Sequence, residues 1–327
     1  MAGPSAGGAY YDPTNGWTNA PLSFAFSSAD IAPRMAGGAL GVMRRSPDNE
    51  LYWTTWTKAA GFSAPQIVNT FGFGVDGPST APAGVASVMT FLGTDNKHYF
   101  AQNDNGAMFG GFGPIPAGDL AIQAFGPSAT TLASDGVGVY AVYAGDNAQI
   151  YYSYKSSAGG AWGPSTQAAS STVVKTIRPF AFVDSAMDLR IFYVRQNDNR
   201  LCMVKLITPQ NAWSAEETIA MATTAVSPAA VETTNGDIVV AYHGLANEGI
   251  YFVRGKDGAF ANISTVEVPA GTSSRPVVVK GLSGADAEIL YATANKLRHA
   301  RVIGNAASPV DVPGLVGVTN VTATIVP

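Results

Sequence analysis

Charged residues and cysteine are both scarce in this chain, and each scarcity excludes a class of protein. Asp, Glu, Lys and Arg make up 13% of the 327 residues, the formal net charge is −4, and no stripe of Lys and Arg occurs. Nucleic-acid binding requires clustered cations that neutralise phosphates, so we expect no nucleic-acid partner. Cys202 is the only cysteine, which excludes an internal disulfide, and we expect a packed core thiol rather than a reactive one.

Signals for metal binding and for membrane insertion are missing as well. His98, His243 and His299 lie far apart, with no carboxylate or cysteine at metal-ligand spacing, so we expect no metal and no cofactor. No apolar stretch approaches the ~20 residues of a membrane span. Residues 1–5 contain no basic region followed by an apolar core, so no signal peptide is visible and the localisation is unknown. A secreted or cell-surface-acting protein would need a signal already removed or another export route.

A repeat marked by asparagine dominates what the chain does contain. The asparagines recur at intervals of 47, 51, 52, 48 and 48 residues, each between two short apolar or aromatic runs: Asn49, Asn96, Asn147, Asn199, Asn247 and Asn295. Asparagine tolerates the left-handed backbone of a tight hairpin turn, so each copy predicts a strand, a turn and a second strand. A period near 48 residues with strands in every repeat predicts a β-propeller with one blade per repeat.

Two further series keep the same spacing. A proline precedes each hairpin and predicts the first residue of an innermost strand, because proline has no N–H to donate. These prolines are Pro33, Pro82, Pro127, Pro179, Pro228 and Pro276. A small residue and an aromatic follow each hairpin: Gly16-Trp17, Gly61-Phe62, Gly111-Phe112, Ala161-Trp162, Ala212-Trp213 and Ala259-Phe260. The order within a repeat predicts a four-stranded antiparallel blade.

The number of blades follows from the residues left over at the two ends. Six complete repeats run from about Ile31 to Pro313, and the 30 residues before them and the 14 after them make almost one more repeat. Residues 9–11 and 22–26 are typical of the last two strands of a blade, and residues 316–326 of the first two. We therefore predict an all-β fold, a single β-propeller domain over residues 1–327. It has seven four-stranded blades, the seventh closed by N- and C-terminal strands. Six blades with short terminal extensions are the alternative.

Catalytic signatures are weak. No Gly-x-Ser-x-Gly nucleophile elbow occurs in a strand-to-helix context. A propeller glycosidase requires two carboxyl groups, or a tyrosine and an acid, at the channel mouth. Residues 104–109 resemble the second half of the Ser-x-Asp-x-Gly-x-x-Trp turn of sialidases, but Gln102 stands at the serine position, and such turns build blades rather than active sites. We expect no enzyme and no catalytic residues, with a sialidase-like glycoside hydrolase as the alternative.

One blade carries a more specific resemblance. Arg190-Ile191-Phe192-Tyr193, the turn at Asn199, and the later Trp213 resemble a blade of the fungal and bacterial fucose-binding propeller lectins. Closure into seven blades is closer to larger propeller lectins for fucose, galactose or related sugars. The resemblance implies the architecture and a glycan partner. It does not imply the Arg–Glu clamp of the six-bladed fucose lectins, because the Glu position is occupied by Trp53, Phe100, Tyr152, Met203, Phe252 and His299.

A sugar site without that clamp needs an aromatic face for the C–H side of a pyranose, with polar groups beside it. In such lectins the grooves between blades open at the rim, where the aromatics after the hairpins are expected. Together with Arg190, the candidate ligand-binding residues are Trp17, Trp162, Trp213, Phe62, Phe112 and Phe260. The alternative is that each aromatic is a wedge between neighbouring blades.

The sequence therefore predicts a multivalent lectin for glycans or glycoconjugates, such as fucosylated or galactosylated structures. A homo-oligomer is left open. A non-catalytic protein-interaction scaffold is the remaining alternative, for which a contiguous apolar patch on one face is expected.

Overall fold

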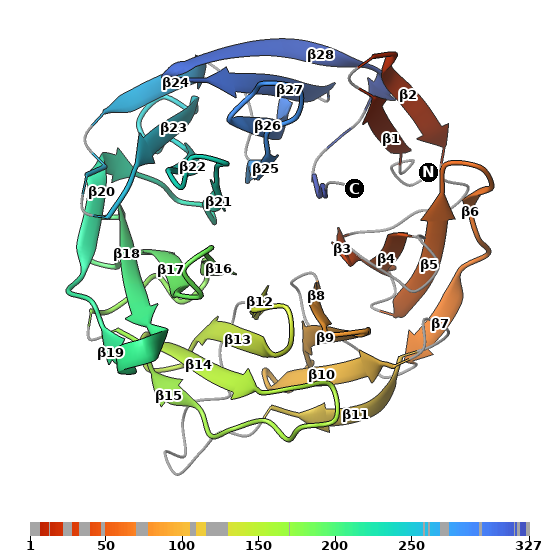
Figure 1. Cartoon of the computed structure of the whole chain (residues 1–327), viewed down its shortest axis with the longest axis vertical. Coiled ribbons are helices and arrows are strands. Elements are labelled where there is room, and N and C mark those ends of the chain that lie inside the picture. The colour runs from red at the N-terminus through yellow and green to blue at the C-terminus, as the bar shows by residue number, and fades with distance from the viewer. Residues whose placement is uncertain are drawn as a thin grey trace.

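The computed structural model describes residues 7–12, 14–21, 28–32, 40–46, 50–69, 78–104, 109–115, 130–169, 171–257, 259–260, 262–268, 275–293, 296–316, 318 and 321–324. Its regular structure is strand, apart from one short 3₁₀ turn, η1 (Thr208–Gln210). The sheets stand side by side in a ring, with the first strand of each sheet nearest the centre (Figure 1). This arrangement confirms the predicted all-β propeller. Among the described residues, no helix has the length and apolar character that a membrane crossing requires.

Six sheets form the blades, and the first four strands of each sheet pair antiparallel in chain order. Blades 1 and 4 have a fifth strand, which pairs with the third strand of its sheet. Blade 1 contains β3 (Ser28–Ala32), β4 (Leu40–Arg45), β5 (Leu51–Thr57), β6 (Gly61–Phe62) and β7 (Gln66–Asn69). Blade 2 contains β8 (Ser79–Ala83), β9 (Ala86–Leu92), β10 (His98–Asn103) and β11 (Gly110–Pro114). Blade 3 contains β12 (Thr131–Ser134), β13 (Val139–Ala144), β14 (Ile150–Lys155) and β15 (Thr166–Gln167).

The second half of the ring follows the same order. Blade 4 contains β16 (Phe180–Val183), β17 (Leu189–Val194), β18 (Arg200–Ile207), β19 (Ala212–Trp213) and β20 (Glu217–Thr223). Blade 5 contains β21 (Ala229–Glu232), β22 (Ile238–His243), β23 (Ile250–Gly255) and β24 (Ile263–Glu267). Blade 6 contains β25 (Val277–Lys280), β26 (Ala287–Thr293), β27 (Lys296–Ile303) and β28 (Ala306–Val316).

The described part of the chain forms six blades, so the predicted seventh is wrong as a four-stranded blade. Only β1 (Gly7–Asp12) and β2 (Gly16–Pro21) stand between blades 6 and 1, and they pair with each other alone (Figure 1). Val318 and residues 321–324, predicted as inner strand, carry no strand structure. Val318 and Val321 instead belong to a hydrophobic cluster that includes Trp17. The termini supply side chains to the closure of the ring without the backbone ladder that a blade requires. The predicted strand at residues 22–26 lies outside the described residues.

The asparagine turns are confirmed at four of the six places. Asn96 and Asn199 adopt the left-handed backbone themselves, with φ of 60° and 55°. At Asn147 and Asn247 the next residue is left-handed instead, and the asparagine amide donates to a tyrosine hydroxyl four residues on, at 2.8 and 2.6 Å. Each turn is therefore fixed by backbone conformation or by a side-chain bond across the hairpin. The remaining two, Asn49 and Asn295, lie outside the described residues.

The proline prediction is confirmed in three blades and wrong in one. Pro179, Pro228 and Pro276 directly precede β16, β21 and β25. Pro82 lies within β8, opposite Ser87, and Pro78 takes the place before that strand. The spacing selected the wrong proline because two occur four residues apart in this repeat. The other two, Pro33 and Pro127, are outside the described part of the chain.

Apolar side chains of adjacent blades pack against each other and hold the ring together. Between blades 3 and 4, Val142 and Ile150 share one buried cluster with Ile191 and Val204. Cys202 is buried in the same cluster, which confirms the packed core thiol, and burial raises the pKa of this thiol to about 11.

Candidate functional site between blades 3 and 4

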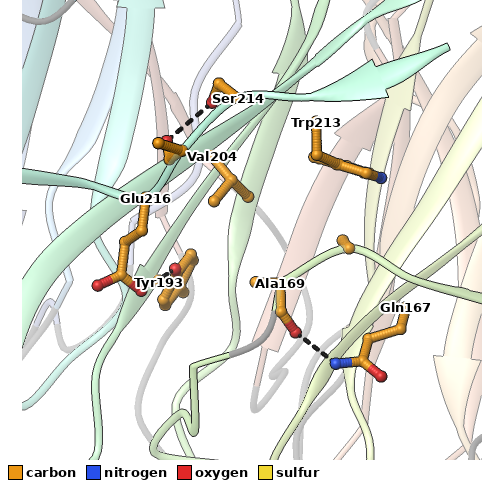
Figure 2. A pocket seen from close by; sticks show the side chains of 9 residues that line it. Gln167, Ala169, Tyr193, Val204, Trp213, Ser214 and Glu216 are labelled. Atoms are coloured by element: carbon orange, nitrogen blue, oxygen red, sulfur yellow. Dashed lines mark hydrogen bonds between the residues drawn. The ribbon is translucent and has the colours of Figure 1, made fainter.

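A cavity of about 330 Å³ lies where the outer parts of blades 3 and 4 meet. Gln167 at the end of β15 and the two alanines after it form the blade 3 side; β17, β18, β19 and the segment after β19 form the blade 4 side. Its lining is Gln167, Ala168, Ala169, Tyr193, Val204, Trp213, Ser214, Ala215 and Glu216. In Figure 2 the Trp213 indole and Gln167 lie at one end, and the Glu216–Tyr193 pair at the other. The volume is that of a small-ligand site.

Trp213 is the aromatic face of the cavity. It ends β19, which pairs with the last residues of β18 through a sharp connection that contains η1 and a left-handed Asn211 (φ 48°). The indole is half-buried, and its edge contacts Tyr152 of blade 3 with ring centroids 5.5 Å apart. The ring is thus anchored by the neighbouring blade while part of it remains open to the cavity.

Glu216 is the charged group of the cavity, and its carboxylate is held from two sides. The Tyr193 hydroxyl donates to Oε2 at 2.5 Å, and the Arg195 guanidinium donates to Oε1 at 2.7 Å. Arg195 is itself fixed by two bonds to Asp198, at 3.1 and 2.7 Å. The carboxylate therefore has a set orientation before any ligand arrives.

Two pKa shifts define the protonation of this pair. Burial would raise the pKa of Glu216, but hydrogen bonds from Ser171, Tyr193 and Arg195 outweigh burial and lower it. Burial, together with the bond to Glu216, raises the pKa of the Tyr193 phenol. At neutral pH Glu216 is thus an anion and an acceptor, and Tyr193 is a neutral donor.

Uncharged polar groups complete the lining. The Gln167 side-chain amide donates to the Ala169 carbonyl at 2.8 Å, which fixes the plane of the amide. The Ser214 hydroxyl donates to the Ala215 carbonyl at 3.0 Å and accepts the Lys205 N–H at the same distance. The cavity combines one aromatic face with a carboxylate, an amide and a hydroxyl. It offers one carboxylate, and the described residues contain no cluster of three or more His, Cys, Asp or Glu that could hold a metal.

Of the seven predicted site residues, only Trp213 lines the cavity. Trp162 is buried, 8% exposed, with its edge against Phe100 at 5.6 Å between centroids. Phe260 is buried in the cluster between blades 4 and 5. The contacts of Trp162 and Phe260 are those of wedges packed between neighbouring blades, the alternative to a role in ligand binding.

The other four predicted residues lie elsewhere on the ring. Trp17 contacts His299 at the closure of the ring, with centroids 5.2 Å apart. Phe62 is half-buried in β6, and Phe112 is 42% exposed on β11. Arg190 is buried and ion-paired to Asp184 at 2.7 Å and, at its other end, to Asp257 of blade 5 at 2.8 Å. Its guanidinium connects blades 4 and 5.

Sequence reasoning missed Tyr193 and Glu216. A signal for the tyrosine exists, because second strands of four consecutive blades carry one at intervals of 50, 49 and 49 residues: Tyr143, Tyr193, Tyr242 and Tyr291. The hydroxyl of Tyr291 likewise donates to a carboxylate, that of Glu267, at 2.5 Å. The place of Glu216, three residues after the tryptophan, recurs in blade 3, where Ser165 accepts the Tyr143 hydroxyl. The repeat therefore marks the position, but it does not tell that the residue there is a carboxylate.

No protein-family model matches the chain, and neither does any curated protein. Solved structures do match the chain. The lectin BP39L of Burkholderia pseudomallei has a TM-score of 0.72 at 12% identity over 90% of this chain and 89% of its own. The fungal Aleuria aurantia lectin, a six-bladed β-propeller with a described mode of fucose recognition, has a TM-score of 0.56 at 13% identity over 90% and 98%. An ulvan lyase, a polysaccharide lyase bound to its saccharide, has a TM-score of 0.58 at 9% identity over 88% and 85%.

The structural neighbours are thus fungal and bacterial β-propeller lectins, as the blade motif predicts, together with a lyase. At identities of 9 to 13% the likeness establishes the propeller fold.

Proposed function

We propose that this protein is a non-catalytic carbohydrate-binding protein and that the cavity between blades 3 and 4 receives a sugar unit. The observation that carries the proposal is the pairing of a half-exposed indole, Trp213, with a carboxylate fixed in advance, Glu216, in one small cavity. Sugars present an apolar C–H face and a ring of hydroxyls, and this lining offers a partner for each. Lectins among the structural neighbours support the same reading.

The residues have distinct roles in this proposal. The pyranose stacks on Trp213, and its hydroxyls donate to Glu216, whose orientation is already set by Tyr193 and Arg195. Because the acceptor is held before binding, little side-chain entropy is lost when the sugar arrives. Gln167 and Ser214 supply further polar contacts along the wall. Fucosylated or galactosylated glycans are the proposed ligand class.

Multivalency belongs to the same proposal. Six blades stand around the ring, and weak sites on a rigid frame gain avidity on a dense glycan surface. Phe62 and Phe112, which keep part of their rings accessible, are the next candidate platforms. The proposal assigns Trp17, Trp162 and Phe260 to packing and Arg190 to the ion pairs between blades.

An enzyme is the second candidate because an ulvan lyase shares the fold. Hydrolysis of a glycosidic bond uses two carboxyl groups about 5 to 10 Å apart. Glu216 is the one carboxylate in the lining of this cavity, and both of its oxygens already accept hydrogen bonds. These contacts favour binding over hydrolysis.

The test is a glycan-array screen of the folded protein, followed by calorimetry with the best ligand for Trp213→Ala and for Val310→Ala as the control. Val310 is 51% exposed on the outer strand β28 of blade 6, away from the cavity and from the candidate platforms. We expect Trp213→Ala to weaken calorimetric affinity at least about tenfold, or about 1.4 kcal/mol, because it removes the stacking face. Val310→Ala should leave the affinity unchanged.

Three results would contradict the proposal. Unchanged affinity in folded Trp213→Ala would remove this cavity as the site. New reducing or unsaturated ends after incubation with a bound glycan would make the protein an enzyme. Silence of the folded protein on a broad array would leave the interaction scaffold as the better account.

A further inference from the structure

Three apolar side chains stand exposed at the turns that join the first and second strands of blades 2, 3 and 4. Val85 is 90% exposed, Val137 62% and Met187 48%. Each belongs to the short turn between β8 and β9, between β12 and β13, or between β16 and β17. We call these three side chains the apolar arc. They lie outside the cavity between blades 3 and 4.

The apolar arc lies on one face of the ring, beside its axis. The innermost strand β12 contacts both β8 and β16, and the three strands are neighbours around the centre in Figure 1. The Gly84 N–H donates to the Gly136 carbonyl at 3.2 Å, so the first two turns touch directly. In the third turn, the Ser185 N–H donates at 2.7 Å to Glu232, the last residue of β21, which continues the same edge into blade 5.

Met187 occupies a backbone conformation that disfavours it. Its φ is 67°, and its N–H closes a turn onto the Asp184 carbonyl. The equivalent turn of blade 5 has Gly236 at this place, with φ 77°. A side chain in the left-handed region is strained, and Met187 is half exposed, so burial does not compensate that strain. The side chain is therefore available for contact outside the fold.

The turns that carry the apolar arc present no outward charge. Asp135 accepts the Gly138 N–H and the Tyr154 hydroxyl, each at 2.6 Å. Asp184 is buried and accepts the Arg190 guanidinium at 2.7 Å. The turns contain no Lys or Arg. Asp188 is buried too and accepts the Thr208 N–H at 3.0 Å. The Glu232 carboxylate beside the third turn accepts both the N–H and the hydroxyl of Ser185 at 2.7 Å. Each of these carboxylates is thus bonded to the protein, and the exposed side chains of the apolar arc are uncharged.

We propose that the apolar arc inserts into the headgroup–acyl boundary of a zwitterionic lipid bilayer, with this face of the propeller against the membrane. Three aliphatic side chains on separate tips offer much less than the roughly 800 Å² per partner of a stable protein interface. Separate protruding tips can each enter lipid, where every buried carbon adds to the affinity. The turns carry no Lys or Arg, so they have no electrostatic preference for anionic lipids, which attract basic surfaces.

Sugar-free phosphatidylcholine vesicles provide the test, with bound protein measured by co-sedimentation. Met187→Gly and Val85→Ser should each weaken the apparent affinity about tenfold, because each removes several inserted carbons. Met187→Gly should also keep or raise the melting temperature, since glycine relieves the left-handed backbone. The matched control is Met221→Ser, a 68% exposed methionine on outer strand β20, which should bind vesicles as the native chain does.

Absence of vesicle binding by the native chain would overturn the proposal, as would undiminished binding by folded Met187→Gly or an equal loss in Met221→Ser. Self-association in the absence of lipid that Met187→Gly abolishes would replace the membrane with a second copy of the chain. Because the vesicles carry no glycan, failure here is independent of the glycan-binding proposal.

Discussion

We expect mild acid to destabilise this propeller through His98. The side chain is 0% exposed, its Nδ1 lies 2.8 Å from the Thr130 hydroxyl, and its ring centroid is 4.6 Å from that of Tyr143. Burial, with a smaller contribution from the charge of Arg178, lowers the pKa of His98 to about 3. The imidazole is therefore neutral in the folded protein throughout the physiological range.

The sign and size of the effect follow from that shift. The folded pKa of about 3 lies below the ordinary value of 6.5, so between these pH values the unfolded chain binds a proton that the folded chain does not. The free energy of unfolding then decreases as pH falls from 6.5 toward about 3, by up to about 1.4 kcal/mol per pH unit and about 5 kcal/mol in all. That total is comparable to the whole stability of many domains.

Urea unfolding at about pH 7, 6 and 5 measures how steeply the free energy of unfolding falls with pH, with His98→Asn as the comparison. Asparagine can keep a hydrogen bond to Thr130 but does not titrate, so the native chain should lose stability with acid more steeply than the variant. Parallel curves for the two proteins would refute the reasoning. If the variant fails to fold, the ring resonances of His98 in the native chain provide the second test, because they should not titrate between about pH 7 and 5.

Two further predictions concern stability and can be read from the same unfolding curves. Asp184→Ala should cost about 3 to 5 kcal/mol, because it leaves the buried Arg190 without its 2.7 Å partner. Asp146→Ala, which breaks an exposed pair with Lys175, should cost about 0 to 1 kcal/mol. Equal losses in these two variants would show that burial does not set the cost. Ala148→Gly should stabilise by about 0.5 to 1 kcal/mol, since Ala148 has φ 60°. Ala144→Gly, in the buried strand β13, should destabilise the protein. Lower stability in both glycine variants would refute the argument that the left-handed backbone of Ala148 makes glycine favourable there.

The period of the fold was predictable because it depends on local chemistry. Turns that need a left-handed residue recur at Asn96 and Asn199, and prolines recur where an innermost strand begins. The number of blades was not predictable in the same way. Counting residues shows that the termini are long enough for one more blade, but a blade also needs paired backbone, and Val318 and residues 321–324 make none.

The site was predictable only in part, and the two tryptophans after the hairpins show why. Trp162 and Trp213 each follow an alanine, and each contacts an aromatic ring of the preceding blade, Phe100 or Tyr152. Trp162 is buried in its cluster, whereas Trp213 faces a cavity. The difference comes from how the neighbouring blade covers each ring. A pattern within one repeat does not contain that information.

The residues that pack blade 4 and the residues of the proposed sugar site lie on different strands, and this separation bears on how many sites we propose for the ring. The second and third strands of blade 4 are almost wholly buried and pack against blade 3 through Ile191 and Val204. Trp213 and Glu216 come from the outer strand and the segment after it, where side chains are half exposed. In blade 6 the inner packing is retained through Ile289 and Tyr291, but the outer strand β28 carries no aromatic between Ala306 and Val316. A groove can therefore lose its stacking face without loss of the packing that closes the ring. The number of glycan sites should follow the outer strands blade by blade, not the number of blades.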